Sequence, residues 1–178
     1  SNVKTMRYMF ANQRHFNQDL ASWNVESAED IRHMFQDALL FESDLSRWNV
    51  AKVAHMGHTF KNAEVFNSDL SRWDVSKVSH FGHMFTRALA FNSDLSAWNV
   101  KKGDYFAAMF YIASSFRQDL GDWKLQDTAD MSTMLSYSAS ECVLEHAGEA
   151  SEGRIVTTTR LYCEDPLTCI GTEYDAYD

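Results

Sequence analysis

Histidines recur in this sequence at a fixed interval, which could bring imidazole groups close together. His33, His58 and His83 are 25 residues apart, and His55 and His80 keep the same interval. Imidazole is a frequent ligand of transition metals, and His55 and His58 have the three-residue spacing of neighbours on a helix. Histidines also titrate near neutral pH, so these rows could form a pH-sensitive contact surface. We favour the simpler interpretation that they are polar residues on a solvent-facing side.

A row of aspartates is the most regular polar feature. Each is followed by a leucine, and the members are Asp19, Asp44, Asp69, Asp94 and Asp119. Carboxylates stacked about 5 Å apart would repel by about 0.8 kcal/mol per neighbour in water. Backbone N–H bonds at a turn would offset this, as would calcium ions shared with Asn17, Asn67 and Asn92. We favour the turn, because each copy offers only two oxygen ligands, and keep calcium at Asp44, Asp69 and Asp94 as the alternative.

The three cysteines all lie near the C-terminus, at positions 142, 163 and 169. This clustering favours an oxidising compartment, with one disulfide and one spare thiol among Cys142, Cys163 and Cys169. Their spacing does not define the pairing, and three free thiols are the alternative. A zinc site with His146 is disfavoured, because the paired close spacings of zinc modules are missing.

Other chemistry is disfavoured by what the sequence lacks. There is no phosphate-binding glycine-rich loop and no interpretable Ser/His/Asp or Cys/His set, so we expect no enzyme and no cofactor. A net charge of −9 argues against nucleic acid, and no apolar run is long enough to span a membrane. The chain begins without an initiator Met or signal peptide, so we expect a mature product or a fragment.

These features belong to a 25-residue repeat that covers about residues 1–135. All twelve Phe follow this period, and so do all five Trp: Trp23, Trp48, Trp73, Trp98 and Trp123. Self-similarity at such a period is typical of solenoids and related arrays. In the first half of the third copy, Val53, Met56, Phe60 and Ala63 are spaced 3, 4 and 3, which predicts one face of a helix.

The second half of each repeat, such as residues 70–75, predicts a short strand. Alternation would place Trp73 and Val75 on one side and Arg72 and Asp74 on the other. Leu-x-x-Trp-x-Val also has the spacing of a leucine-rich repeat. We therefore predict an α/β fold, a right-handed leucine-rich-repeat-like solenoid of about five 25-residue strand-helix coils with a parallel sheet and a C-terminal cap.

The predicted cap is residues 136–178, a second unit that is acidic and contains the cysteines. Its net charge is −7, whereas residues 1–135 have a net charge of −2. Within it we expect a short helix near 143–146 and a strand over 154–162, which is rich in β-branched residues.

The outward positions of the predicted strands would line a concave face suited to binding. The candidate binding residues on this face are Arg47, Asn49, Arg72, Asp74 and Asn99. Their mixed charge favours protein or glycan ligands over nucleic acid.

The repeat resembles a known family. Residues 76–100 contain Met-Phe-x-x-Ala-x-x-Phe-Asn-x-Asp-Leu-Ser-x-Trp-Asn-Val, which resembles the mycoplasma-lipoprotein-type repeat of BspA-like surface proteins. The pattern departs at Glu42 and Arg117, which replace the Asn, and at Gly103, which replaces the first Val. The resemblance implies an extracellular or cell-surface location and an adhesive or structural role, with no catalytic motif.

The expected function is therefore contact rather than catalysis. We expect a non-catalytic extracellular repeat protein that acts in adhesion or as a subunit of a larger assembly or fibre. Its partners would be proteins, including further copies of itself. The alternative is a monomeric recognition module that binds a protein or glycan on the concave face.

Overall fold

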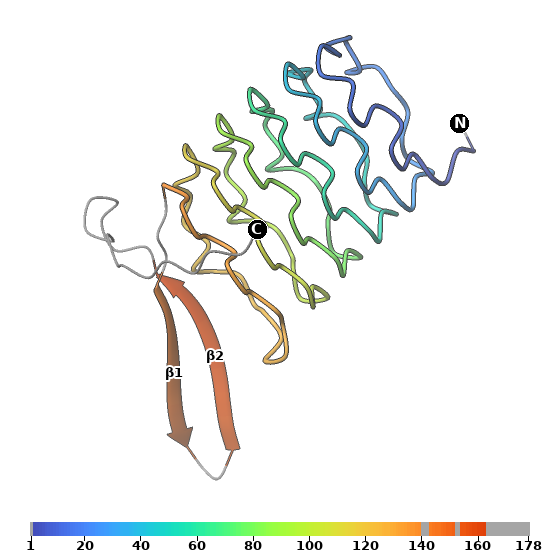
Figure 1. The fold of residues 1–178 in the computed structure, drawn as a ribbon. Helices are drawn as coiled ribbons and strands as arrows, with labels where there is room; N and C mark the ends of the chain where they lie inside the picture. Colours follow the sequence, from blue (N-terminus) through green and yellow to red (C-terminus); the bar gives the residue numbers. More distant parts are fainter. Residues whose placement is uncertain (1, 140–142, 152–153, 163–178) are drawn as a thin grey trace.

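The protein is a stack of similar coils followed by a hairpin, as the computed structural model in Figure 1 shows. The structure describes residues 2–139 and the backbone of 143–151 and 154–162. Isolated parallel bridges join residues 25 positions apart, from Thr5 with Asp30 to Tyr105 with Asp130. Each repeat therefore forms one coil. We number the coils 1 to 6, beginning at residues 3, 28, 53, 78, 103 and 128.

Backbone hydrogen bonds link each coil to the next at four alternate residues. In coil 1 the N–H groups of Met6, Tyr8, Phe10 and Asn12 donate to carbonyl oxygens of coil 2. The same positions make the same bonds at all five interfaces between described coils, with N···O distances of 2.7–3.2 Å. Intervening N–H groups bond three residues back within their own coil. These four bonds always run from the N–H of one coil to the C=O of the following coil.

The prediction of a helix in each coil is wrong, because the described residues contain no helix. Val53, Met56, Phe60 and Ala63 are all fully buried, as the pattern requires, but the backbone there forms consecutive tight turns. Half of the N–H groups bond the next coil, whereas a helix would bond them all within its own segment. Apolar residues spaced three and four apart indicate which side chains are buried. They do not distinguish a helix from a series of tight turns.

Residues with positive φ interrupt any helix in this segment. His58 (φ 62°) and Asn62 (φ 58°) are third residues of the turns Met56–Thr59 and Phe60–Ala63, where type II turns require positive φ. Asn, Asp and His tolerate this left-handed conformation better than most residues. The equivalent residues elsewhere are Tyr8, Asn12, His33, Asp37, His83, Arg87, Ala108, Ile112, Thr133 and Tyr137.

The predicted parallel sheet of the second half-repeat is also wrong. Within the described residues the only strands belong to the C-terminal hairpin, and side chains connect the coils here instead. Leu20 donates its N–H to Ser43 Oγ (2.8 Å), and its carbonyl oxygen accepts from Trp48 Nε1 (3.0 Å). Leu45 and Leu70 make the same pair of bonds to the following coil. The fold is thus a stack of turn-built coils and not an α/β strand-helix arrangement.

The core consists of columns of equivalent side chains. Phe60 stacks on Phe85 with ring centroids 5.6 Å apart, and Trp48 stacks on Trp73 at 6.5 Å. All of these rings are buried. The predicted alternation is confirmed, since Trp73 and Val75 are buried whereas Arg72 and Asp74 are exposed.

The hairpin pairs β1 (Val143–Ser151) with β2 (Arg154–Tyr162) in antiparallel register. The predicted helix near 143–146 is wrong, because these residues begin β1. The predicted strand over 154–162 is confirmed as β2. The division between residues 135 and 136, and the role of residues 136–178 as a cap, stay predictions.

Candidate functional site: the exposed rows of the coil stack

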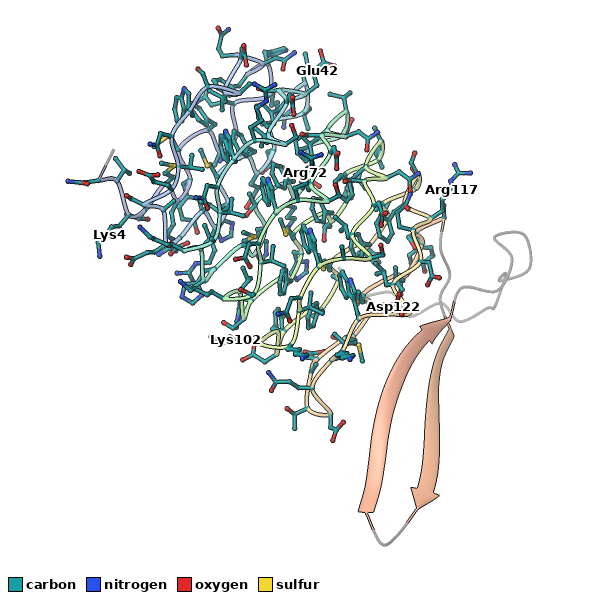
Figure 2. All side chains as sticks on the ribbon, turned by 180° about the vertical axis from the view of Figure 1, so that it is seen from behind. Lys4, Glu42, Arg72, Lys102, Arg117 and Asp122 are labelled. Carbon is teal, nitrogen blue, oxygen red and sulfur yellow. The ribbon has the colours of Figure 1, made fainter. Side chains whose placement is uncertain are left out.

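The candidate binding row lies on the surface of coils 2 to 4. Arg47, Asn49, Arg72, Asp74 and Asn99 are all exposed, because they alternate with buried Trp and Val residues. Figure 2 shows Arg72 on the face between Lys4, at the N-terminal end, and Arg117, towards the other end. The structure therefore brings the five residues to one surface, where equivalent positions of successive coils follow one another.

Three members of this row also hold turns. Asn49, Asp74 and Asn99 each accept, through Oδ1, the backbone N–H two residues ahead, at 3.2, 3.0 and 3.4 Å. Sequence reasoning missed this role, although Asn and Asp commonly make such turns. Arg47 and Arg72 form no ion pair within the described residues. Their guanidinium groups are the parts of the row that are free to bind a ligand.

The aspartate row has the structural role that we favoured. Oδ1 of each member accepts the backbone N–H two residues ahead, at 2.8–2.9 Å, for Asp19, Asp44, Asp69, Asp94 and Asp119. Hydrogen bonds from Ser46 hold the pKa of Asp44 below its usual value, and those from Ser71 do the same for Asp69. N–H and hydroxyl donors face the carboxylates of Asp44 and Asp69 and favour their charged form.

One histidine row forms a continuous column of stacked rings. The rings of His33 and His58 lie 4.5 Å apart and those of His58 and His83 4.6 Å apart, and Tyr8 stacks on His33 at 4.4 Å. These histidines are half-buried, so the expectation that His58 faces solvent is only partly met. Burial, and then His83, His33 and Lys61, lower the pKa of His58 to about 4. His58, in the middle of the column, is therefore neutral at neutral pH.

The second histidine row is more open. His55 and His80 meet edge to face at 6.5 Å, and His80 stacks on Tyr105 at 5.1 Å. His80 Nδ1 also lies 3.5 Å from Asp104 Oδ1. His55 and His58 stand in different rows, so the structure does not bring them together as one metal site.

No metal centre forms in the part of the chain that the structure describes. Among those residues, no three His, Cys, Asp or Glu gather closely enough to hold a metal ion. The predicted disulfide candidates Cys142, Cys163 and Cys169 lie outside the described residues. Within the described residues, no helix has the length and apolar character needed to cross a membrane.

The sequence did not reveal that coil 1 presents apolar side chains at the N-terminal end of the stack. Met9 is 44% exposed and Trp23 is 38% exposed, whereas the equivalent residues of the inner coils, such as Met34 and Trp73, are at most 4% exposed. Tyr8, which ends the histidine column, is also exposed. These three residues occupy repeat positions whose equivalents in coils 2 to 5 pack against the preceding described coil.

Comparison with protein families matches residues 1–73 and 41–143 to the family described as "Mycoplasma protein of unknown function, DUF285". The chain belongs to this family. The two overlapping matches include every described coil, so membership rests on the 25-residue repeat. Neither a curated protein nor a solved structure matches the chain.

Proposed function

We propose that this protein is a non-catalytic repeat module at the cell surface or outside the cell, acting in adhesion or as a subunit of a larger assembly. The supporting observation concerns the rows of equivalent polar residues. Their side chains either hold turns and stacked rings or are exposed once in each coil. Asp69 and Asp74 hold turns, and His58 stacks between two other rings. Arg47 and Arg72 project identical cationic groups from consecutive coils. Such a surface suits repeated contacts with another protein.

The resemblance of the repeat to BspA-like surface proteins supports this proposal. The BspA-like surface proteins that the repeat resembles have adhesive and structural roles, and the family match covers the coils. We assign the same class of role to this chain.

Surface location is tested by labelling lysines on intact producing cells with a biotin reagent that does not cross membranes. Lys52, Lys77 and Lys102 are exposed and accessible to the reagent. We expect labelling without lysis, whereas labelling that requires lysis would contradict the proposal.

The alternative is a monomeric module that recognises a protein or glycan through the arginines of the row. The observation that favours it is the absence of an ion pair at Arg47 and Arg72 among the described residues. Binding of purified protein to immobilised mucin, fibronectin and a glycan panel would be compared for wild type and an Arg47→Ala, Arg72→Ala double variant. Lys52→Ala with Lys77→Ala is the matched control, since it removes the same charge from the same two coils. At least tenfold weaker binding for the arginine variant alone would support recognition by this row, and equal binding would exclude it.

A further inference from the structure

One side of the stack is basic, where the second halves of coils 2 to 4 follow one another. We call residues 46–52, 71–77 and 96–102 together the basic face. It has a net charge of +5, whereas the whole chain has a net charge of −9. Its cations, all exposed, are Arg47, Lys52, Arg72, Lys77, Lys101 and Lys102. The same segment has a net charge of −1 in coil 1 and in coil 5, so the basic face belongs to the middle of the stack.

The cations of the basic face lie in register from coil to coil. Lys52, Lys77 and Lys102 are equivalent residues of three consecutive coils, and Arg47 and Arg72 are equivalent in two. The buried rings next to the two arginines, those of the tryptophans at positions 48 and 73, stack 6.5 Å apart, which gives the step between coils at this face. Like charges opposite one another on neighbouring backbone segments are destabilising. Figure 2 shows two of the cations, Arg72 and Lys102, on this side of the stack.

The described residues supply no counter-ion in contact with these cations. None of the six makes an ion pair or donates a side-chain hydrogen bond within the part of the chain that the structure describes. The neighbouring aspartate row acts only at longer range: hydrogen bonds from Ser46 lower the pKa of Asp44, and Arg47 has a smaller effect in the same direction. The charge of the basic face is therefore available to a ligand.

The hydrogen-bonding groups of the basic face are mainly donors. Oδ1 of Asn49, Asp74 and Asn99 already accepts a backbone N–H in a turn. The amide N–H groups of the two asparagines remain as donors, beside guanidinium and ammonium groups that can only donate. The complement of such a face is a ligand rich in charged acceptors, such as sulfate or carboxylate oxygens.

From this charge, register and donor content we propose that the basic face binds a linear acidic polysaccharide, whose sulfate or carboxylate groups contact the cations of successive coils. The inference deepens the proposed function, and rests on it, by naming the ligand class of the exposed surface. A repeating polymer fits because each of the three coils offers two cations. The site is wider than the arginine row, because it includes the lysines.

Other polyanions fit the basic face less well. Proteins that bind single-stranded nucleic acid stack its bases on aromatic side chains, whereas Trp48, Trp73 and Trp98 are at most 4% exposed. Binding to a lipid surface relies on apolar side chains that enter it, and no large apolar side chain of the basic face is exposed. An acidic sugar polymer needs only the charge pairs and hydrogen bonds that this face supplies.

The test measures binding of the full chain to immobilised heparin, which carries sulfate groups, and to alginate, which carries only carboxylates. Neutral dextran, single-stranded poly(dT) and phosphatidylglycerol vesicles are the comparison ligands. One variant combines Arg47→Ala with Arg72→Ala, and a second combines Lys52→Ala with Lys77→Ala. The matched control combines Arg14→Ala with Arg117→Ala, since both arginines are exposed outside the basic face and the change in net charge is the same. Circular dichroism melting checks that each variant is folded.

We expect wild type to bind heparin, alginate or both, more weakly as salt rises, and not to bind dextran. Each variant of the basic face should bind at least tenfold more weakly, and the control should stay within about twofold of wild type. No binding to either acidic polymer would overturn the proposal, as would an equal loss in the control. Tighter binding of poly(dT) or of vesicles would also overturn it. A loss with the arginine pair alone would restrict the site to the arginine row and refute the basic face.

A measurement on wild type keeps the test valid if a variant fails to fold. Bound polymer should slow acetylation of Lys52, Lys77 and Lys102 several-fold and leave Lys61, in the first half of coil 3, unchanged. Equal rates with and without polymer would contradict the proposal. A chain that is labelled on intact cells but binds no acidic polymer would refute the polysaccharide site and leave the surface function standing, whereas binding by a chain labelled only after lysis would do the reverse.

Discussion

Trp73 Nε1 donates a 3.0 Å hydrogen bond to the carbonyl oxygen of Leu45 in the preceding coil. The backbone N–H of the same leucine bonds Ser68 Oγ at 2.8 Å. Because residues 45 and 70 are not paired by a backbone ladder, these two side chains replace it in the second half of the repeat. The invariant spacing of the tryptophans thus serves hydrogen bonding between coils as well as apolar packing.

Trp73→Phe should lower the free energy of unfolding by about 2 kcal/mol or more, measured by urea denaturation of dilute protein. It removes the bond to Leu45 and leaves a cavity where the larger ring was. Trp23→Phe is the matched control, because the indole N–H of Trp23 bonds no described residue and its side chain is 38% exposed. Equal losses for the two variants would show that the hydrogen bond contributes nothing.

Ser68→Ala should destabilise the stack by about 1–3 kcal/mol, since it leaves the N–H of Leu45 buried and unpaired. Ser68 is 9% exposed, and its hydroxyl also donates to Asp44 Oδ1 at 3.4 Å. Ser79→Ala serves as the control, because Ser79 is partly exposed and its hydroxyl makes no hydrogen bond to the part of the chain that the structure describes. The comparison is made by urea denaturation, and a loss no greater than that of the control would contradict the role of Ser68.

The contribution of the aspartate row to stability should depend on its turn hydrogen bonds and not on calcium. Asp69→Ala should cost about 1 kcal/mol through the lost bond to the N–H of Ser71, whereas Asp69→Asn should cost less because an amide oxygen can accept the same bond. Thermal melting should give the same midpoint in calcium chloride and in EDTA. A rise of several degrees with calcium would instead support the cation site.

The same row gives a pH dependence of known sign. Hydrogen bonds from Ser71 lower the pKa of Asp69 from its ordinary 3.8, so the folded state binds this proton less readily than the unfolded chain does. The stabilisation is therefore complete above pH 3.8 and is lost as pH falls through the folded-state pKa. Denaturation of Asp69→Asn below pH 4 should show a smaller loss than wild type, and an identical loss would contradict the assignment.

The sequence predicted burial and periodicity correctly but predicted the wrong backbone. Phe60 and Trp73 are buried where the repeat places them, because apolar periodicity directly reflects which side chains avoid water. The helix was wrong because tight turns and helices share a three- to four-residue spacing. His58 and Asn62, four residues apart and tolerant of positive φ, were the signal that distinguishes the two.

The site was less predictable than the core. The exposure of Arg72 was predictable, because exposed and buried residues alternate in this segment. The hydrogen bond that Asp74 accepts from the N–H of Ser76 was not, because it depends on the local turn geometry.

Acid should weaken the fold through the stacked histidines well before the aspartates protonate. The folded-state pKa of His58 is lowered to about 4 by burial and by His83, His33 and Lys61, against 6.5 in the unfolded chain. Between these two values the unfolded chain binds the proton and the folded chain does not, so stability falls as pH falls from 6.5 to about 4. We expect a loss of about 1–2 kcal/mol over this window, since His58 is only half-buried and solvent screens the effect.

His58→Asn isolates this contribution, because Asn also tolerates the φ of 62° at this position. Urea denaturation from pH 7.5 to 4.5 should show a smaller loss of stability for the variant than for wild type. His55→Asn is the control, since His55 lies in the other row and is not part of the stacked column. If His58→Asn and wild type lose stability in parallel, protonation within the column is not what weakens the fold, and the low pKa of His58 is wrong.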